Sequence, residues 1–147
     1  MYKSIVVGTD GSPTATGAVS AAIALASSLD ARLHVVCVYD SAHVSTAIAS
    51  TAGIASSVTE IDQAARDHTN SVLDEARGRA RAAGVEVTVH ACAGSPAETI
   101  MQVADGEDAD LIVVGNRGMM GARRILGSVP NHVAHHARCA VMIVPTT

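Results

Sequence analysis

The chain has 147 residues, which suits a single domain spanning 1–147, and 48% of its residues are hydrophobic. It contains no Trp, no Phe and only two Tyr, and its formal net charge is -4, so we expect no nucleic-acid partner. No segment has the pattern of a secretory leader or the length of a membrane span. Three cysteines, Cys37, Cys92 and Cys139, lie far apart in apolar runs and predict free buried thiols. We therefore expect a cytoplasmic protein without membrane contact.

The first part of the chain predicts two buried strands joined by a helix. Residues 3–8 form an apolar strand that ends in the turn Gly8-Thr-Asp-Gly-Ser-Pro13, in which Ser-Pro is typical of a helix start. The helix carries apolar residues at helical spacing to about residue 29, and residues 32–38 form the second strand. Residues 41–59 show little periodicity, which indicates a long loop, with a partly helical segment as the alternative, that is mobile or covers a site.

The remainder of the chain continues the alternation of helices and strands. The expected elements are an amphipathic helix over 60–83, an edge strand over 85–91, a helix over 96–106, a fully buried strand over 109–114, a helix over 128–137 and a strand over 140–144. This alternation predicts a parallel sheet with helices on both faces. If the first and fourth strands are neighbours, the order 3-2-1-4-5 brings the turns after them to one crevice.

The segment after the fourth strand has the chemistry of an anion-binding site. Gly115 and Gly118 allow a sharp bend and a close approach of an anion to the backbone amides. A helix then begins at Gly127-Ser128, with Ser128 as a suitable N-cap and Pro130 in the first turn. A helix start offers unpaired N–H groups and a partial positive charge, so phosphate is the expected anion. The sequence lacks a Walker lysine and a Gly-x-Ser-x-Gly elbow.

These motifs resemble the universal stress protein family over nearly the whole chain. The matching segments are Ile5-Val-Val-Gly-Thr-Asp-Gly-Ser12, Gly94-Ser-Pro-Ala-Glu98, Ala109-Asp-Leu-Ile-Val-Val-Gly115, Gly127-Ser-Val-Pro130 and Val141-Met-Ile-Val-Pro145. ATP-binding members carry Gly-x2-Gly-x9-Gly-Ser/Thr, whereas only eight residues separate Gly118 from Gly127 here, so the loop is one residue short. The resemblance implies a Rossmann-like, three-layer α/β fold similar to that of the adenine nucleotide α-hydrolases.

The resemblance also implies an adenine nucleotide ligand and a role for each part of the site. The first turn would lie along the nucleoside, the main chain of Val38 would meet adenine, the glycine turn would wrap the ribose and first phosphates, and the last helix would hold the outer phosphates. The candidate binding residues are Gly8, Thr9, Asp10, Val38, Gly115, Asn116, Arg117, Gly118, Met119, Gly121, Gly127, Ser128, Val129 and Pro130. Asp10 is also the candidate contact to a nucleotide-bound Mg²⁺.

The implied function is a regulatory homodimer that signals by ATP occupancy. The family tends to pair through its last strand, here Val141, Met142, Ile143 and Val144, which would close an apolar sheet edge. We expect no catalytic residue and at most slow hydrolysis, since no evident base or P-loop lysine is present. A sink for cyclic AMP or AMP, a slow ATPase and a nucleotide-free interaction protein remain alternatives.

Several polar residues admit two interpretations. Asp10 either binds ribose or a metal, which we favour, or only forms an Asx turn before Ser12. Arg117 is the best-placed cation for phosphate, whereas Arg123 and Arg124 fit a phosphate contact and a solvated loop equally well.

The histidines of the last predicted helix also admit two interpretations. His132 and His136 share a helix face at the spacing of two metal ligands, and His135 lies beside them. Because no carboxylate or Cys stands within a turn, we favour a half-exposed helix face over a zinc site.

Overall fold

The computed structural model describes residues 1–39, 55–117 and 128–145, and it contains a five-stranded sheet of order β3-β2-β1-β4-β5. Every neighbouring pair of strands is parallel, as predicted. The strands are β1 (Ser4–Thr9), β2 (Arg32–Tyr39), β3 (Val87–Ala93), β4 (Leu111–Gly115) and β5 (Ala140–Val144). The helices are α1 (Pro13–Leu29), α3 (Ala55–Ala82), α4 (Pro96–Gly106) and α5 (Ser128–His136).

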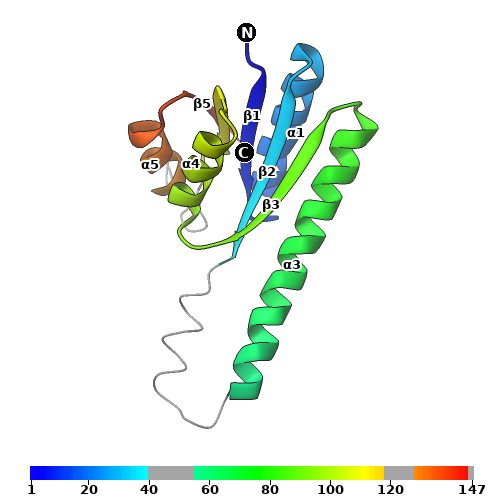
Figure 1. The fold of residues 1–147 in the computed structure, drawn as a ribbon, viewed down its shortest axis with the longest axis vertical. Helices are drawn as coiled ribbons and strands as arrows, with labels where there is room; N and C mark the ends of the chain where they lie inside the picture. Colours follow the sequence, from blue (N-terminus) through cyan, green and yellow to red (C-terminus); the bar gives the residue numbers. More distant parts are fainter. Residues whose placement is uncertain (40–54, 118–127, 146–147) are drawn as a thin grey trace.

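The helices cover both faces of the sheet, which confirms the predicted three layers. Figure 1 shows α1 and α3 on one side of the strands, and α4 and α5 on the other. Successive strand residues point to opposite faces, so Ile5 and Val7 join the core under α1 and α3. Val6 and Val36 join the core under α4 and α5. The central strands are therefore apolar on both sides, which is why they appear in the sequence as continuous apolar runs.

The single acid beside the fourth strand has a structural role. Asp110 lies directly before β4 and accepts hydrogen bonds from the backbone nitrogens of Lys3 (2.8 Å) and Ser4 (3.2 Å). Its own backbone nitrogen donates to the Ser4 carbonyl oxygen at 3.0 Å. The carboxylate thus satisfies two amides where β1 begins and fixes β4 beside it.

Two similar Ser-Pro helix starts differ in their capping. The Ser12 hydroxyl accepts a hydrogen bond from the Ala15 nitrogen at 3.2 Å and caps α1, as predicted. Ser95 occupies the same N-cap position before α4, but its side chain makes no capping hydrogen bond, so the predicted cap is absent there. Ser128, which was predicted as an N-cap, is instead the first residue of α5.

Several predicted boundaries were displaced: β4, for example, begins at Leu111 rather than at residue 109, and two other displacements have a clear cause. The helix predicted over 60–83 begins at Ala55, because extending an existing helix needs no apolar periodicity once its first turn has formed. The rest of the predicted loop lies outside the described residues. The strand predicted over 85–91 runs from Val87 to Ala93, because Gly84 (φ 74°) and Val85 still close the end of α3. The Val85 nitrogen donates to the Ala80 carbonyl at 3.0 Å.

The longest described helix is α3, with 28 residues. Arg and Asp side chains form ion pairs on its surface, for example Arg66 with Asp62 at 3.2 Å. In the part of the chain that the structure describes, no helix combines the length and the apolar character that crossing a bilayer requires.

Candidate functional site

A cavity of about 450 Å³ opens at the carboxyl ends of β1, β2 and β4. The first residues of α1, α4 and α5 complete its walls. It is lined by Gly8, Thr9, Asp10, Ser12, Ala15, Val36, Val38, Gly94, Ser95, Pro96, Ala97, Glu98, Ile100, Val114, Gly115, Arg117, Ser128, Val129, Pro130 and His132. The two predicted turns therefore meet at one rim of the sheet.

The position of the cavity follows from the order of the strands. β1 and β4 are neighbours, with Ile5 opposite Leu111 and Val7 opposite Val113. The helix after β1 packs on one face of the sheet, and α5, which follows β4 along the chain, packs on the other (Figure 1). A crevice forms where the chain leaves neighbouring parallel strands toward opposite faces, and ligands of such sheets bind there.

Most described candidate residues from the sequence lie on the cavity wall. They are Gly8, Thr9, Asp10, Val38, Gly115, Arg117, Ser128, Val129 and Pro130. Asn116 does not line the cavity, and its backbone nitrogen donates to the Val144 carbonyl at 3.0 Å, which continues the pairing of β4 with β5. Gly118, Met119, Gly121 and Gly127 lie outside the described residues, as do Arg123 and Arg124.

The turn after β1 is held by its own side chains. Asp10 Oδ1 accepts a hydrogen bond from the Ser12 nitrogen at 2.9 Å, so the Asx turn is present. Thr9 Oγ1 accepts one from the Gly11 nitrogen at 3.2 Å. Gly11 has φ 80°, and a Cβ there would lie 2.6 Å from Val72 Cγ2, so this position requires glycine. Asp10 also lines the cavity, so its proposed ligand contact is compatible with the turn.

Sequence reasoning missed the wall that α4 provides. The turn at Gly94 (φ 132°), the first residues of α4 and the side chain of Ile100 all line the cavity. The signal was present, because Gly94-Ser95-Pro96 repeats the pattern of Gly11-Ser12-Pro13 and also follows a parallel strand. Two such turns after parallel strands must open on the same edge of the sheet.

The cavity combines an apolar part with a few charged groups. Val36, Val38 and Ile100 form apolar wall, whereas Asp10 and Glu98 bring carboxylates. Arg117 and the start of α5 bring a cation and the positive end of a helix dipole. Such a cavity can hold a flat apolar ring against the valines, hydroxyl groups near a carboxylate and an anion near the arginine.

The histidines of α5 lie partly at this site. His132 is half-buried and lines the cavity, whereas His135 and His136 are exposed, which matches the predicted half-exposed face. The rings of His132 and His136 stack with centroids 4.2 Å apart. Their position at the cavity was not predicted, because the sequence does not reveal which side of α5 faces the crevice.

The cysteines lie away from the chemistry of the cavity. All three are free thiols, and Cys37 is buried on the opposite face of β2 from Val38. Burial raises the pKa of the Cys37 thiol, partly offset by a hydrogen bond with the Thr69 side chain. Burial also raises the pKa values of Cys92 and Cys139. The prediction of buried thiols is confirmed for Cys37, whereas Cys92 and Cys139 are only partly buried. A raised pKa lowers the thiolate fraction, so the three thiols have low reactivity.

Comparison with known proteins gives a consistent set of relatives. The sequence profile described as "Universal stress protein family" matches residues 1–145. Universal stress protein Rv1636 of Mycobacterium tuberculosis is 36% identical, over 99% of this chain and 98% of that protein. A universal stress protein solved in complex with cAMP is 32% identical and covers 99% of this chain and 98% of its own, with a TM-score of 0.72. UspA from Lactobacillus plantarum is 25% identical over 97% of each chain, with a TM-score of 0.84.

Proposed function

Because the chain belongs to the universal stress protein family, we propose that it is an adenine-nucleotide-binding regulatory module of the cytoplasm, formed by a single domain over 1–147. ATP is the nucleotide that we assign to the site. The observation that carries this proposal is the cavity at the carboxyl ends of β1, β2 and β4. Its volume of about 450 Å³ lies within the range of small-molecule sites. Its lining combines apolar side chains with the first residues of α5, where a helix start favours anions.

The chemistry of the walls supports one orientation of the nucleotide. The adenine ring would pack near Val38, where the main chain of β2 can offer hydrogen bonds, with Ile100 as an apolar neighbour. The ribose hydroxyls would face the carboxylate of Asp10. The phosphates would extend toward Gly115, Arg117 and the start of α5, where backbone N–H groups and a guanidinium favour anions. A Mg²⁺ ion carried by the nucleotide would approach Asp10.

A cyclic AMP or AMP sink is the second candidate function. The similar protein solved with cAMP supports it, because that chain is 32% identical and of nearly the same length. The glycine loop, which is one residue shorter than the ATP-binding pattern, also suits a ligand with fewer phosphates.

We assign no catalytic residue. The described part of the cavity wall carries carboxylates at Asp10 and Glu98 but no lysine that would offset charge on a leaving phosphate. Hydrolysis would therefore be slow, and the bound state itself would carry the signal.

Calorimetric titration with ATP, AMP and cyclic AMP, with and without Mg²⁺, tests the assignment. Arg117→Gln should weaken ATP binding by roughly tenfold or more, since a charge-assisted hydrogen bond contributes about 1.5–3 kcal/mol. Arg138→Gln is the matched control, because Arg138 is exposed and pairs with Asp105 at 3.7 Å outside the cavity. Equal ATP affinity in wild type and Arg117→Gln would contradict the phosphate placement. Tighter binding of cyclic AMP than of ATP would favour the second candidate.

We also propose that the chain forms a homodimer through β5. Within the described residues, β5 is an outer strand that pairs only with β4. Met142 on this strand is 38% exposed, and the strand is apolar throughout. An apolar edge strand is a surface that proteins normally cover, and pairing with a second copy would cover it.

A further inference from the structure

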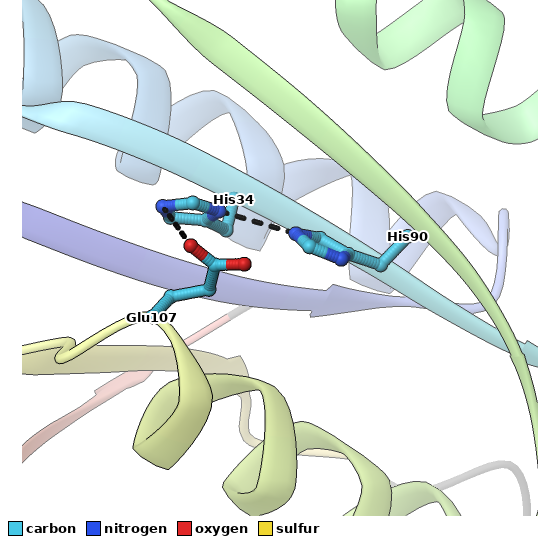
Figure 2. A group of neighbouring side chains, drawn as sticks. All are labelled: His34, His90 and Glu107. Carbon is cyan, nitrogen blue, oxygen red and sulfur yellow. Dashed lines mark hydrogen bonds and ion pairs between the residues drawn. The ribbon is translucent and has the colours of Figure 1, made fainter.

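A second cluster of titratable side chains lies outside the cavity, on the α4 face of the sheet. It consists of His34 on β2, His90 on β3 and Glu107, the residue directly after α4. Figure 2 shows the two imidazole rings beside one another and the Glu107 carboxylate pointing toward the His34 ring. None of the three lines the nucleotide cavity, so this cluster is independent of the proposed nucleotide site.

The register of the sheet brings the two histidines together. His34 and Val36 are two residues apart on β2 and point to the same face, toward α4. Val36 is opposite His90 on β3, so both rings lie on that face one step apart. His34 Nδ1 lies 3.1 Å from His90 Nε2, and His34 Nε2 lies 3.9 Å from Glu107 Oε2.

The buried histidine is incompletely satisfied. His34 is only 3% exposed, and its Nε2 atom is buried without a hydrogen-bond partner. The distance to Glu107 exceeds that of a hydrogen bond. The contact between His34 Nδ1 and His90 Nε2 uses one N–H hydrogen, which either ring can supply. Whichever ring supplies it, His34 Nε2 stays 3.9 Å from Glu107 Oε2 and has no hydrogen-bond partner. The side chains of the cluster therefore do not satisfy one another in the arrangement that the structure shows.

We propose that His34, His90 and Glu107 bind a divalent transition-metal ion, with Zn²⁺ as the best match. One ligand atom from each residue lies within 4.8 Å of the others. The 3.1 Å between the ring nitrogens is close to the roughly 3.3 Å that separates two tetrahedral ligands with bonds of about 2.0–2.1 Å. The ion would replace the hydrogen atom shared between the rings. The ion would bind His34 through Nδ1, so the proton of this ring would reside on Nε2, and the Glu107 carboxylate would turn from the Nε2 side of the ring toward the ion.

The donor set selects the class of metal. Two imidazoles and one carboxylate suit Zn²⁺ and similar ions, whereas Mg²⁺ and Ca²⁺ require oxygen ligands. The Glu107 side chain is 39% exposed, so it can rotate toward the ion, and water can complete the coordination. An ion at this position would link the end of α4 to β2 and β3.

The test is a competition titration of EDTA-treated protein with Zn²⁺ and a chromophoric zinc indicator, supported by the visible spectrum of the Co²⁺ form. Wild-type protein should bind one Zn²⁺ per chain, and excess Mg²⁺ should not compete. His90→Gln and Glu107→Gln should each weaken Zn²⁺ binding by at least about tenfold, since even groups that only support ligands contribute that much. Both residues are partly exposed, and circular dichroism checks that each variant folds.

The control variant carries His132→Gln and His136→Gln, which removes the stacked histidine pair of α5 as a competing metal site. Zn²⁺ affinity in this control should equal that of wild type. Zn²⁺ affinity that is lost in the α5 control but retained in His90→Gln would overturn the proposal. So would a wild-type protein that does not remove Zn²⁺ from the indicator. Tetrahedral Co²⁺ bands that persist in folded Glu107→Gln and His90→Gln would also overturn it.

Discussion

The contact between Gly8 and Ile100 allows a sharp test of packing at the cavity wall. A Cβ built on Gly8 would lie 2.4 Å from Ile100 Cδ1 and 3.2 Å from Ile100 Cγ1. Ile100 is only 4% exposed and belongs to the core between the sheet and α4. Cδ1 is the far end of this side chain and can turn, but Cγ1 must also give way within the core. We expect Gly8→Ala to lower the free energy of unfolding by about 1–3 kcal/mol, the usual cost of overpacking a core.

A second substitution removes the atom that causes the clash. Ile100→Val deletes Cδ1 and keeps a γ carbon, at a cost of about 0.5–1.5 kcal/mol when made alone. In the double variant the methyl group added by Gly8→Ala meets no atom at the forbidden distance. The combined loss of unfolding free energy should therefore be smaller than the sum of the single losses, by about 1–2 kcal/mol. Urea unfolding followed by circular dichroism measures all three values.

Gly78→Ala is the matched control for this cycle. Gly78 lies inside α3, and a Cβ there would meet nothing within 4 Å. Alanine at such a helical position should stabilise the protein by about 0.5–1 kcal/mol. The steric argument fails if Gly8→Ala is as harmless as this control. It also fails if the Gly8 and Ile100 losses add to within about 0.5 kcal/mol.

Three further outcomes follow from the described contacts. Asp110→Ala should lower the free energy of unfolding by about 1–3 kcal/mol, because the backbone amides of Lys3 and Ser4, where β1 begins, lose their acceptor. A urea midpoint equal to wild type would contradict this. Burial raises the pKa of the Cys37 thiol, so the unfolded chain releases this proton first, and stability should fall as the pH rises above 9.0. That fall should be smaller in Cys37→Ala, and equal slopes in the two proteins would refute the assignment. Met142→Lys should shift the sedimentation of a dimer toward the monomer, and an unchanged profile would mean that β5 is not the interface.

The sheet and its ligand crevice were predictable because their signals are local. The runs from Ile5 to Val7 and from Leu111 to Val114 are apolar at every position, which only strands covered on both faces require. The turns that follow them carry glycine and helix-start residues, so both had to open at the carboxyl edge. The wall formed by α4 was missed, although Gly94-Ser95-Pro96 carries the same local signal.

The difference between Ser12 and Ser95 marks the limit of such local reasoning. Both serines precede a proline at a helix start, yet only Ser12 forms the side-chain capping bond. The backbone before Ser95 passes through Gly94 at φ 132°, whereas Gly11 has φ 80°. The chain therefore enters the two helices along different paths, and the sequence pattern Gly-Ser-Pro is the same for both.

The histidine cluster could not be predicted for a different reason. His34 and His90 are 56 residues apart, and in the sequence each is an ordinary polar residue of a predicted strand. Their contact depends on the register that places Val36 opposite His90. A shift of β3 by one residue would turn His90 to the opposite face of the sheet, toward α3, and separate it from His34 and Glu107. Register is fixed by packing on both faces of the sheet, so a site that depends on it becomes visible only in three dimensions.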